Sequence, residues 1–262
     1  MTELSNWKIG GASVSGFSHI EEDIPCQDAH AYNIGEGGWL IAALADGAGS
    51  ARLSHIGAKA FVDDIVENSQ SLNLTNEFDP EKITAFLIKS VNNTSQRLLE
   101  GHEPKEDAEP CIKSDFAATL VVVFANSDGG AFFHVGDGAG AAIAADKSVN
   151  AIITKPQNGE YANETYFVTM ENWDSYLRVT QFGSGFDTIL LMSDGVTPMA
   201  MAKGCAEPFY AFVDPVIRYL REATPADADA ALIGTLKNEK IRSVTGDDKS
   251  LVWAVRPSKY KE

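Results

Sequence analysis

The apolar positions of the chain fall into short runs that are typical of strands and longer segments with a helical period. Runs of strand length cover Trp7–Gly16, Trp39–Ala45, Thr119–Ala125, Ala131–Val135, Ala139–Ala145, Ala151–Lys155, Tyr166–Thr169, Leu177–Phe182, Phe186–Ser193 and Ser250–Val255. The second of these is almost entirely apolar, which predicts a strand buried on both faces. Polar, glycine-rich pieces at 126–130, 136–138 and 183–185 predict turns, and we expect the last to close a hairpin.

Four segments place apolar residues at helical spacing. One runs from Ile56 to about Asn68, and a second begins at Asp79-Pro80-Glu81, where an acid precedes a proline. The second helix has the longest apolar face, with Ile83, Phe86, Leu87, Ser90, Val91, Thr94 and Leu98. A third carries Phe209, Phe212, Val213, Val216, Ile217 and Leu220 on one face, and an alanine-rich fourth begins near Asp227.

The order of these elements predicts the fold class. Strands come first, followed by two helices, a long series of strands, two more helices and a last strand. A parallel sheet would need a helix between most strand pairs, and the middle of the chain has none. We therefore expect an α+β domain of antiparallel sheets with helices packed outside. The 262 residues, 44% of them hydrophobic, suffice for one sizeable core, so we expect a single domain over residues 1–262.

Composition indicates the cellular compartment in which we expect the protein. No apolar run approaches the roughly 20 residues of a membrane span, and residues 1–8 lack the basic-then-apolar pattern of a signal peptide. The three cysteines, Cys26, Cys111 and Cys205, are far apart and form no CxxC pair. That number and spacing argue against a disulfide framework or a zinc site. We expect a cytoplasmic protein with no membrane partner.

The charge balance excludes one class of partner. The net charge is −16, the opposite sign to that of a protein that binds nucleic acid through its phosphates. Part of the excess lies in one segment, which we interpret as a solvated loop and which contains Glu100, Glu103, Glu106, Asp107 and Glu109. The remainder is compatible with a site that attracts cations or basic protein segments.

Carboxylates follow two of the apolar runs directly. Asp46-Gly47 comes after the run that ends at Ala45, and Asp194-Gly195 comes after the run that ends at Ser193. An acidic cluster at Asp247 opens the last apolar run, and Asp28 lies on a fourth segment. Taken singly, each is explained as well by a turn. Jointly, they predict a site for hard divalent cations, which prefer oxygen ligands.

Five short motifs lie in order along the chain, namely Cys26-Gln27-Asp28-Ala29-His30, Ala45-Asp46-Gly47-Ala48-Gly49-Ser50, His134-Val135-Gly136-Asp137-Gly138, Met192-Ser193-Asp194-Gly195-Val196 and Gly246-Asp247-Asp248-Lys249-Ser250. Their order and spacing resemble the protein phosphatase 2C family of metal-dependent serine/threonine phosphatases. The resemblance extends from about Gly11 to Val255. The QDA and DGAGS forms, with the stretch Gly159–Thr165, look like the compact bacterial branch of that family.

The resemblance implies a fold and a cofactor. The fold is a four-layer α/β/β/α sandwich of two antiparallel sheets flanked by helix pairs. The cofactor is a pair of Mn²⁺ or Mg²⁺ ions at one end of the sandwich. By this likeness Asp46 bridges both ions, the Gly47 carbonyl binds one, Asp194 and Asp247 bind the other, and Asp28 acts through water.

The resemblance also implies an activity, the hydrolysis of phosphoserine and phosphothreonine in proteins, as part of signal transduction. Two metals about 3.5–4 Å apart hold a bridging water, lower its pKa and clamp both oxygens of an in-line phosphoryl displacement. Phosphorylated proteins are then the substrates, and a serine/threonine kinase that acts in the opposite direction is an expected partner.

Two positions depart from the family pattern. Ala48 stands where many members have a histidine proposed to protonate the leaving oxygen, and Asp23 stands where the phosphate-binding arginine usually lies. His19 and Arg52 are the candidates to bind phosphate in its place, and we count His19 among the catalytic residues. A structural role for His19 and a plain surface position for Arg52 are open alternatives. A water or His55 would supply the missing acid.

Other polar positions have weaker assignments. Asp115 is a candidate ligand of a third, weaker metal site, although a turn before a strand explains it equally well. Asp137 is expected to be a structural turn residue, and Asp248 is expected to support the ligand that precedes it. The segment Gln157–Asp174 falls where the family carries a variable flap that sets specificity.

Two other functions are alternatives to the enzyme. Ala48 and Asp23 favour a catalytically weak, phosphatase-like binding or sensing module, whereas the presence of every expected metal-binding carboxylate argues against it. Gly136-Asp137-Gly138-Ala139-Gly140 resembles part of a dinucleotide-binding fingerprint, which also requires a crossover helix. The following stretch, 155–159, contains proline and glycine and breaks such a helix, so nucleotide binding is disfavoured.

Overall fold

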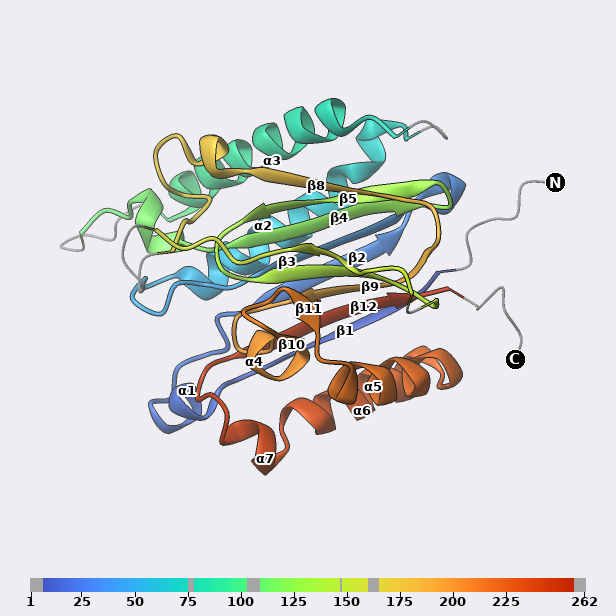
Figure 1. Ribbon diagram of the computed structural model, residues 1–262. Coiled ribbons are helices and arrows are strands. Elements are labelled where there is room, and N and C mark those ends of the chain that lie inside the picture. Colours follow the sequence, from blue (N-terminus) through green and yellow to red (C-terminus); the bar gives the residue numbers. More distant parts are fainter. Residues whose placement is uncertain (1–6, 75–77, 103–108, 147, 160–164, 257–262) are drawn as a thin grey trace.

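The computed structural model describes residues 7–74, 78–102, 109–146, 148–159 and 165–256. Two sheets pack face to face, and helices cover the outer side of each (Figure 1). All strand pairings in the two large sheets are antiparallel. The α+β fold and the four-layer α/β/β/α sandwich predicted from the sequence are confirmed.

The first sheet has five strands in the order β2-β3-β4-β5-β8. Their bounds are β2 Ala29–Ile34, β3 Leu40–Ala45, β4 Leu120–Asn126, β5 Gly129–Val135 and β8 Arg178–Gly183. Helices α2 (Ser54–Asn68) and α3 (Pro80–Gly101) pack on its outer face, where they form one core with alternate strand residues. Every residue of β3 is buried, as its apolar sequence predicts.

The second sheet has the order β1-β12-β9-β6-β7. Its strands are β1 Lys8–Val14, β12 Lys249–Val255, β9 Phe186–Met192, β6 Ala139–Ala144 and β7 Ile152–Thr154. Helices α5 (Tyr210–Glu222) and α6 (Pro225–Leu236) cover its outer face and form a second core with it. In Figure 1 these helices lie at the bottom, and α3 lies at the top.

A third core fills the space between the two sheets. Successive residues of β3 point to opposite faces, so Ile41 and Ala43 belong to the helix-covered core whereas Leu40, Ala42 and Leu44 belong to the core between the sheets. This packing fixes the position of one sheet relative to the other. Strand ends from the two sheets that meet at the same end of the sandwich are therefore held close together.

Short elements complete the described chain. They are α1 Phe17–Glu21, α4 Thr197–Ala200, α7 Glu239–Arg242, β10 Met201–Ala202, β11 Glu207–Pro208 and four 3₁₀ turns at Glu36–Gly38, Ser69–Leu72, Lys113–Phe116 and Trp173–Tyr176. The predicted start of α3 is confirmed, because the Asp79 side chain accepts a hydrogen bond from Lys82 N at 3.0 Å and Pro80 is the first helical residue. Among the described residues, no helix combines the length and apolar character that a membrane crossing requires.

Two sequence predictions about local structure were wrong, and two elements were missed. The turn at 183–185 does not close a hairpin, because β8 pairs with β5 in one sheet and β9 pairs with β6 and β12 in the other. The predicted strand Tyr166–Thr169 is absent, and only Thr165 makes an isolated bridge, to Asn158. The half-buried strand β2 and the short helix α1 were missed, because neither carries a regular apolar period.

The contact between α2 and the 3₁₀ turn at Lys113–Phe116 gives a test of the packing. A Cβ on Gly57 would lie 2.2 Å from the Phe116 carbonyl oxygen, whereas a Cβ on Gly234 in α6 would meet no atom within 4 Å. We expect Gly57→Ala to lower the free energy of unfolding by about 1–3 kcal/mol, because backbone must move. Gly234→Ala, the matched control, should raise it by about 0.5–1 kcal/mol. Urea unfolding measures both changes. A Gly57→Ala variant with an unchanged free energy of unfolding would contradict this packing.

Candidate metal centre

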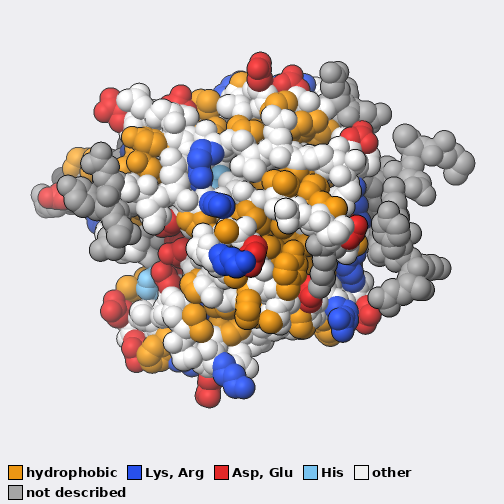
Figure 2. All heavy atoms as spheres, in the orientation of Figure 1, with side chains coloured by type: hydrophobic (Ala, Val, Ile, Leu, Met, Phe, Trp, Pro, Cys, Tyr) orange, Lys and Arg blue, Asp and Glu red, His pale blue; other side chains and the backbone are white. Residues whose placement is uncertain are grey.

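Strand register brings the acidic residues to one end of the sandwich. Ala29 of β2 pairs with Ala45 of β3, so the preceding Asp28 and the following Asp46 lie side by side. In the other sheet, Met192 of β9 pairs with both Leu251 of β12 and Ala139 of β6. Asp194 and Asp137 lie two residues beyond these pairs, and Asp247 lies four residues before Leu251. Figure 2 shows acidic side chains gathered at the left of the molecule, between its upper and lower halves.

Three of these carboxylates form a compact cluster. One oxygen each from Asp46, Asp137 and Asp194 lies within 4.8 Å of the others. They line a cavity of about 380 Å³ together with Gly49, Ser50, Thr119, Thr165, Phe167 and Met170. Asp137, which the sequence predicts to be a structural turn residue, also has its carboxylate in this cluster. The turn crosses from β5 in one sheet to β6 in the other and carries Asp137 into the cluster.

Burial and mutual repulsion make these acids hard to ionise. Desolvation, with the charges of Asp28 and Asp194, holds the pKa of Asp46 well above its ordinary value. Desolvation and the charge of Asp248 raise the pKa of Asp28 to about 8, and desolvation with the charges of Asp247 and Asp137 raises the pKa of Asp194 to about 6. Asp247 also contributes, since its charge raises the pKa of both Asp46 and Asp194. The carboxylates at this end of the sandwich therefore act on one another electrostatically.

The carboxylate oxygens fit a hard divalent cation. Both oxygens of Asp28 and one of Asp194 are buried without a hydrogen-bond partner of acceptable geometry. The hydroxyls of Ser193 and Ser250 lie close enough to Asp28 to lower its pKa somewhat, but burial and the Asp248 charge outweigh them. Buried carboxylates of this kind are normally compensated by a cation or by hydrogen bonds. An oxygen-only donor set is the one that Mg²⁺ and Mn²⁺ prefer.

Backbone contacts hold Asp46 and Gly47 in place. The Asp46 amide donates to the Thr119 hydroxyl at 3.1 Å, and the Asp46 carbonyl accepts from Thr119 N at 2.8 Å. A Cβ on Gly47 would lie 2.8 Å from the Gln27 carbonyl oxygen and 2.9 Å from Ser54. Only glycine fits between these segments, so the position of Gly47 depends on close packing around it.

Asp248 ties the loop of Asp247 to the rest of the site. Its buried carboxylate accepts hydrogen bonds from Gly16 N at 2.7 Å and Gln27 N at 2.5 Å. The His19 Nδ1 atom lies 2.9 Å from the same carboxylate. Asp248 thus joins three chain segments, as expected of a residue that supports a ligand. The phosphate-binding and catalytic roles of His19 stay predictions, and its contact with Asp248 matches the structural alternative.

Arg52 and Asp115 are bound to each other. The Arg52 guanidinium donates to both Asp115 oxygens, at 3.1 and 2.8 Å, and Ile112 N donates to Asp115 at 2.9 Å. These hydrogen bonds hold the pKa of Asp115 below its ordinary value. Among the described residues, the cluster of metal-binding geometry includes Asp137 and not Asp115. The structure therefore gives no geometric support to a phosphate role for Arg52 or a metal role for Asp115.

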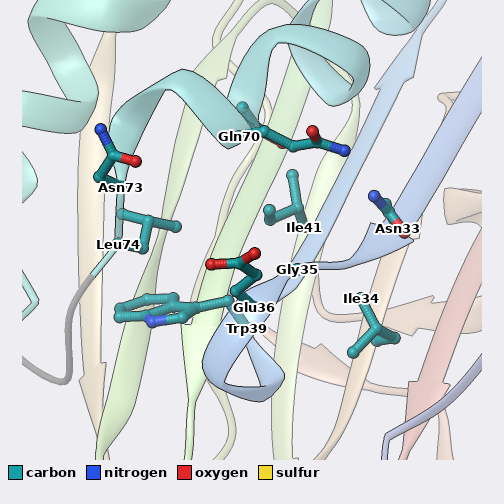
Figure 3. A pocket seen from close by; sticks show the side chains of 10 residues that line it. Asn33, Ile34, Gly35, Glu36, Trp39, Ile41, Gln70, Asn73 and Leu74 are labelled. Carbon is teal, nitrogen blue, oxygen red and sulfur yellow. The ribbon is translucent and has the colours of Figure 1, made fainter.

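A larger cavity lies at the opposite end of β3. It has a volume of about 640 Å³ and is lined by the start of β3, the preceding 3₁₀ turn and the 3₁₀ turn after α2. Figure 3 shows the amides of Asn33 and Gln70 and the carboxylate of Glu36 around it, with Trp39 on one side. None of the predicted site residues lines this cavity. The acidic centre is therefore the better candidate for chemistry.

Comparison with known proteins agrees with this assignment. The family model described as Protein phosphatase 2C matches residues 15–237. The chain belongs to the protein phosphatase 2C family. The matched range contains Asp28, Asp46, Asp137 and Asp194, whereas Asp247 lies beyond its end. The place of Asp247 in the site is supported by the strand register and by its effect on the pKa of Asp46 and Asp194.

Individual relatives extend the family match over nearly the whole chain. Serine/threonine-protein phosphatase 3 of Escherichia coli (strain K12) is 29% identical over 260 residues, which cover 95% of this chain and 98% of the relative. The serine/threonine phosphatase Stp1 from Staphylococcus aureus has a similar fold, with a TM-score of 0.61, 14% identity and coverage of 98% of each chain. The catalytic domain of the phosphatase PstP, solved with two manganese ions, has a TM-score of 0.60, 15% identity, and coverage of 96% and 99%.

Asp137 is the site residue that sequence reasoning missed. The signal was present, because Asp137-Gly138 follows an apolar run in the same way as Asp46-Gly47 and Asp194-Gly195. A turn between successive strands explains the same residues, because apolar runs flank them on both sides. A crossing between sheets is not visible in local sequence, since it depends on which strands become partners.

The raised pKa values predict a pH dependence of the metal-free protein. A carboxyl whose folded-state pKa exceeds its unfolded value stabilises the fold at low pH, and this contribution is lost as pH rises through the folded pKa. For Asp194 and Asp28 the loss spans the range from about pH 4 to about pH 8. In EDTA, we expect the free energy of unfolding to fall over this range by at most about 1.4 kcal/mol per pH unit for each such carboxyl.

The variant Asp28→Asn isolates the contribution of one carboxyl to this dependence. It should fall less steeply with pH than the wild-type protein in urea unfolding at pH 5, 6.5 and 8. A wild-type protein whose free energy of unfolding falls no more steeply with pH than that of the variant would contradict the electrostatic description.

The two candidate residues for an additional metal ligand can be separated by titration. We expect Asp137→Asn to weaken or remove a Mn²⁺-binding event, because it removes one of three clustered oxygens. Asp115→Asn should lower stability through loss of the Arg52 contacts and leave Mn²⁺ binding unchanged. Isothermal titration calorimetry gives the stoichiometry and affinity for each. The reverse pattern would restore the sequence-based assignment of Asp115.

Proposed function

We propose that this chain, acting as one catalytic domain, hydrolyses phosphoserine and phosphothreonine in proteins with the help of Mn²⁺ or Mg²⁺. The observation that carries the proposal is the oxygen cluster of Asp46, Asp137 and Asp194 in a member of the protein phosphatase 2C family. The carboxylate oxygens suit a divalent cation, and the three aspartates line a cavity. Family membership and site geometry thus support the same activity.

The chain offers a set of oxygen donors for two ions. We propose that Asp46 and Gly47 hold one side of the centre, that Asp194 and Asp247 hold the other, and that Asp28 acts through water. Asp137 supplies an oxygen to an additional ion or to this pair. When bound, such ions activate a water and offset the negative charge on the phosphoryl oxygens.

The protein positions these donors through a set of fixed contacts. Thr119 holds the backbone of Asp46 through two hydrogen bonds. The Thr165 hydroxyl donates to Asp137 and so orients its carboxylate. Phe167 and Met170 add apolar side chains to the lining of the same cavity.

Proton delivery to the leaving oxygen has no side-chain donor at position 48. Ala48 cannot donate a proton, and its amide is engaged with the Ala117 carbonyl at 2.9 Å. We propose that a water serves as the acid. A weaker assistance to the leaving group would favour substrates whose leaving oxygen has a low pKa, because such a group departs with less need of a proton.

The charge of the protein bears on the choice of substrate. A net charge of −16 and an acidic site attract positively charged segments and repel acidic ones. We therefore propose phosphoproteins with basic residues near the phosphorylated position as substrates. We further propose a cytoplasmic role in signalling, opposite a serine/threonine kinase.

Phosphatase activity can be tested with a phosphothreonine peptide and with an aryl phosphate. We expect Mn²⁺-dependent phosphate release that EDTA abolishes. Asp46→Asn should lower the rate by on the order of 100-fold or more, because even partners behind a metal ligand cost 10–100-fold when removed. Asp146→Asn is the matched control, since Asp146 is an exposed turn residue remote from the cluster.

Two outcomes would contradict the proposal. One is equal activity of the wild-type protein and Asp46→Asn. The other is a protein that binds Mn²⁺ in calorimetry and releases no phosphate from either substrate, which would establish the alternative of a binding or sensing module.

A further inference from the structure

A lysine side chain is buried beside the acidic cluster. Lys249 is the first residue of β12, and only 2% of its surface is exposed. Its Nζ atom donates to the Thr245 carbonyl at 3.1 Å and to the Asp247 carbonyl at 2.6 Å. A buried ammonium is costly unless it is hydrogen-bonded and compensated by negative charge. Here the two carbonyls and the nearby charges of Asp247, Asp248 and Asp28 provide both.

The two carbonyls belong to the loop that delivers Asp247. Within the same loop, Asp247 N donates to the Thr245 hydroxyl at 3.1 Å, and Asp248 N donates to the Asp247 carboxylate at 2.9 Å. The Lys249 ammonium therefore fixes two carbonyls of the loop, while the other two hydrogen bonds fix the amides of Asp247 and Asp248. The backbone and the carboxylate of Asp247 are both held.

The stem of Lys249 also reaches the other metal-binding segment. A Cβ on Gly195 would lie 3.4 Å from Lys249 Cγ and 1.9 Å from the Asp248 carbonyl oxygen. Gly195 directly follows Asp194, so the aliphatic part of Lys249 lies close to the point where the segments of Asp194 and Asp247 meet. Lys249 is therefore near both segments that are proposed to bind the same ion.

We propose that Lys249 is a positioning residue that holds the Asp247 loop in its metal-binding conformation before the metal arrives. The inference rests on the proposed metal centre and adds a residue to it. A preformed site binds more tightly because less conformational entropy is lost on binding.

The sign of one measurement separates positioning from simple charge. A positive charge near the centre repels a divalent cation, so on electrostatic grounds its removal should tighten Mn²⁺ binding. If Lys249 acts by holding the loop, its removal should weaken Mn²⁺ binding in spite of this gain. The two roles therefore predict opposite changes in the dissociation constant.

The chain contains a matched control for this lysine. Lys8 Nζ also donates to two backbone carbonyls, those of Arg221 and Ala223 at the end of α5. It lies at the start of β1, opposite Val255 and hence at the far end of β12 from Lys249. Lys8→Met removes the same kind of contact without touching the acidic centre.

The experiment measures Mn²⁺ affinity by calorimetry on the full-length metal-free protein. We expect Lys249→Met to raise the Mn²⁺ dissociation constant by roughly 10-fold, the lower end of the cost of losing partners behind a metal ligand. Lys8→Met should lower the urea midpoint and leave Mn²⁺ affinity unchanged. In an Asp247→Asn background, Lys249→Met should have little further effect on affinity, because the ligand that it positions is gone.

A second variant guards against misfolding of Lys249→Met. Thr245→Val removes the hydroxyl that accepts from Asp247 N and keeps the lysine charge, so it should also weaken Mn²⁺ binding if the loop must be preformed. Circular dichroism reports which variants fold. Failure of Lys249→Met to fold, together with unchanged affinity in Thr245→Val, overturns the inference.

The remaining outcomes separate failure of the positioning role from failure of the proposed phosphatase activity. Tighter or unchanged Mn²⁺ binding in Lys249→Met overturns the positioning role, while wild-type turnover stands. A wild-type protein that binds Mn²⁺ and shows the expected loss in Lys249→Met, but releases no phosphate, supports the positioning role and contradicts the phosphatase. A wild-type protein that binds no Mn²⁺ overturns both.

Discussion

Repulsion among carboxylates packed at one end of the sandwich is the constraint on which the site depends. Asp28, Asp46 and Asp194 have raised pKa values because burial and neighbouring charges disfavour ionisation. Such an arrangement costs stability in the metal-free protein, and a bound divalent cation would relieve it. The fold holds these groups together through strand register and through the core between the sheets. Rigid packing thus opposes the repulsion.

Neighbouring groups hold the carboxylates in place and partly offset their charge. Asp248 accepts two backbone amides and contacts His19, which anchors the loop of Asp247 to the segment before β2. Lys249 adds a buried positive charge whose hydrogen bonds go to backbone carbonyls of that loop. Since no carboxylate oxygen has to pair directly with this lysine, the proposed ligands keep their oxygens for a metal.

Much of the fold and the outline of the site could be predicted from sequence because they depend on local pattern. The all-apolar β3, the capped start of α3 and the strand-end acids Asp46 and Asp194 each have a local signal. Strand partners do not, so the sequence predicts a hairpin after β8 and gives no sign that Asp137 reaches the acidic cluster. The pairing of Arg52 with Asp115, 63 residues apart, is equally invisible in sequence.

The central claim is that the separate acids form one metal centre. Anomalous scattering at the manganese edge, from crystals grown with Mn²⁺, tests it most directly because it locates each ion independently of the protein atoms. The account predicts peaks within coordination distance, about 2.0–2.3 Å, of oxygens from Asp46 and Asp194. Peaks that lie elsewhere, or an acidic cluster that stays free of manganese at saturating concentration, would contradict it.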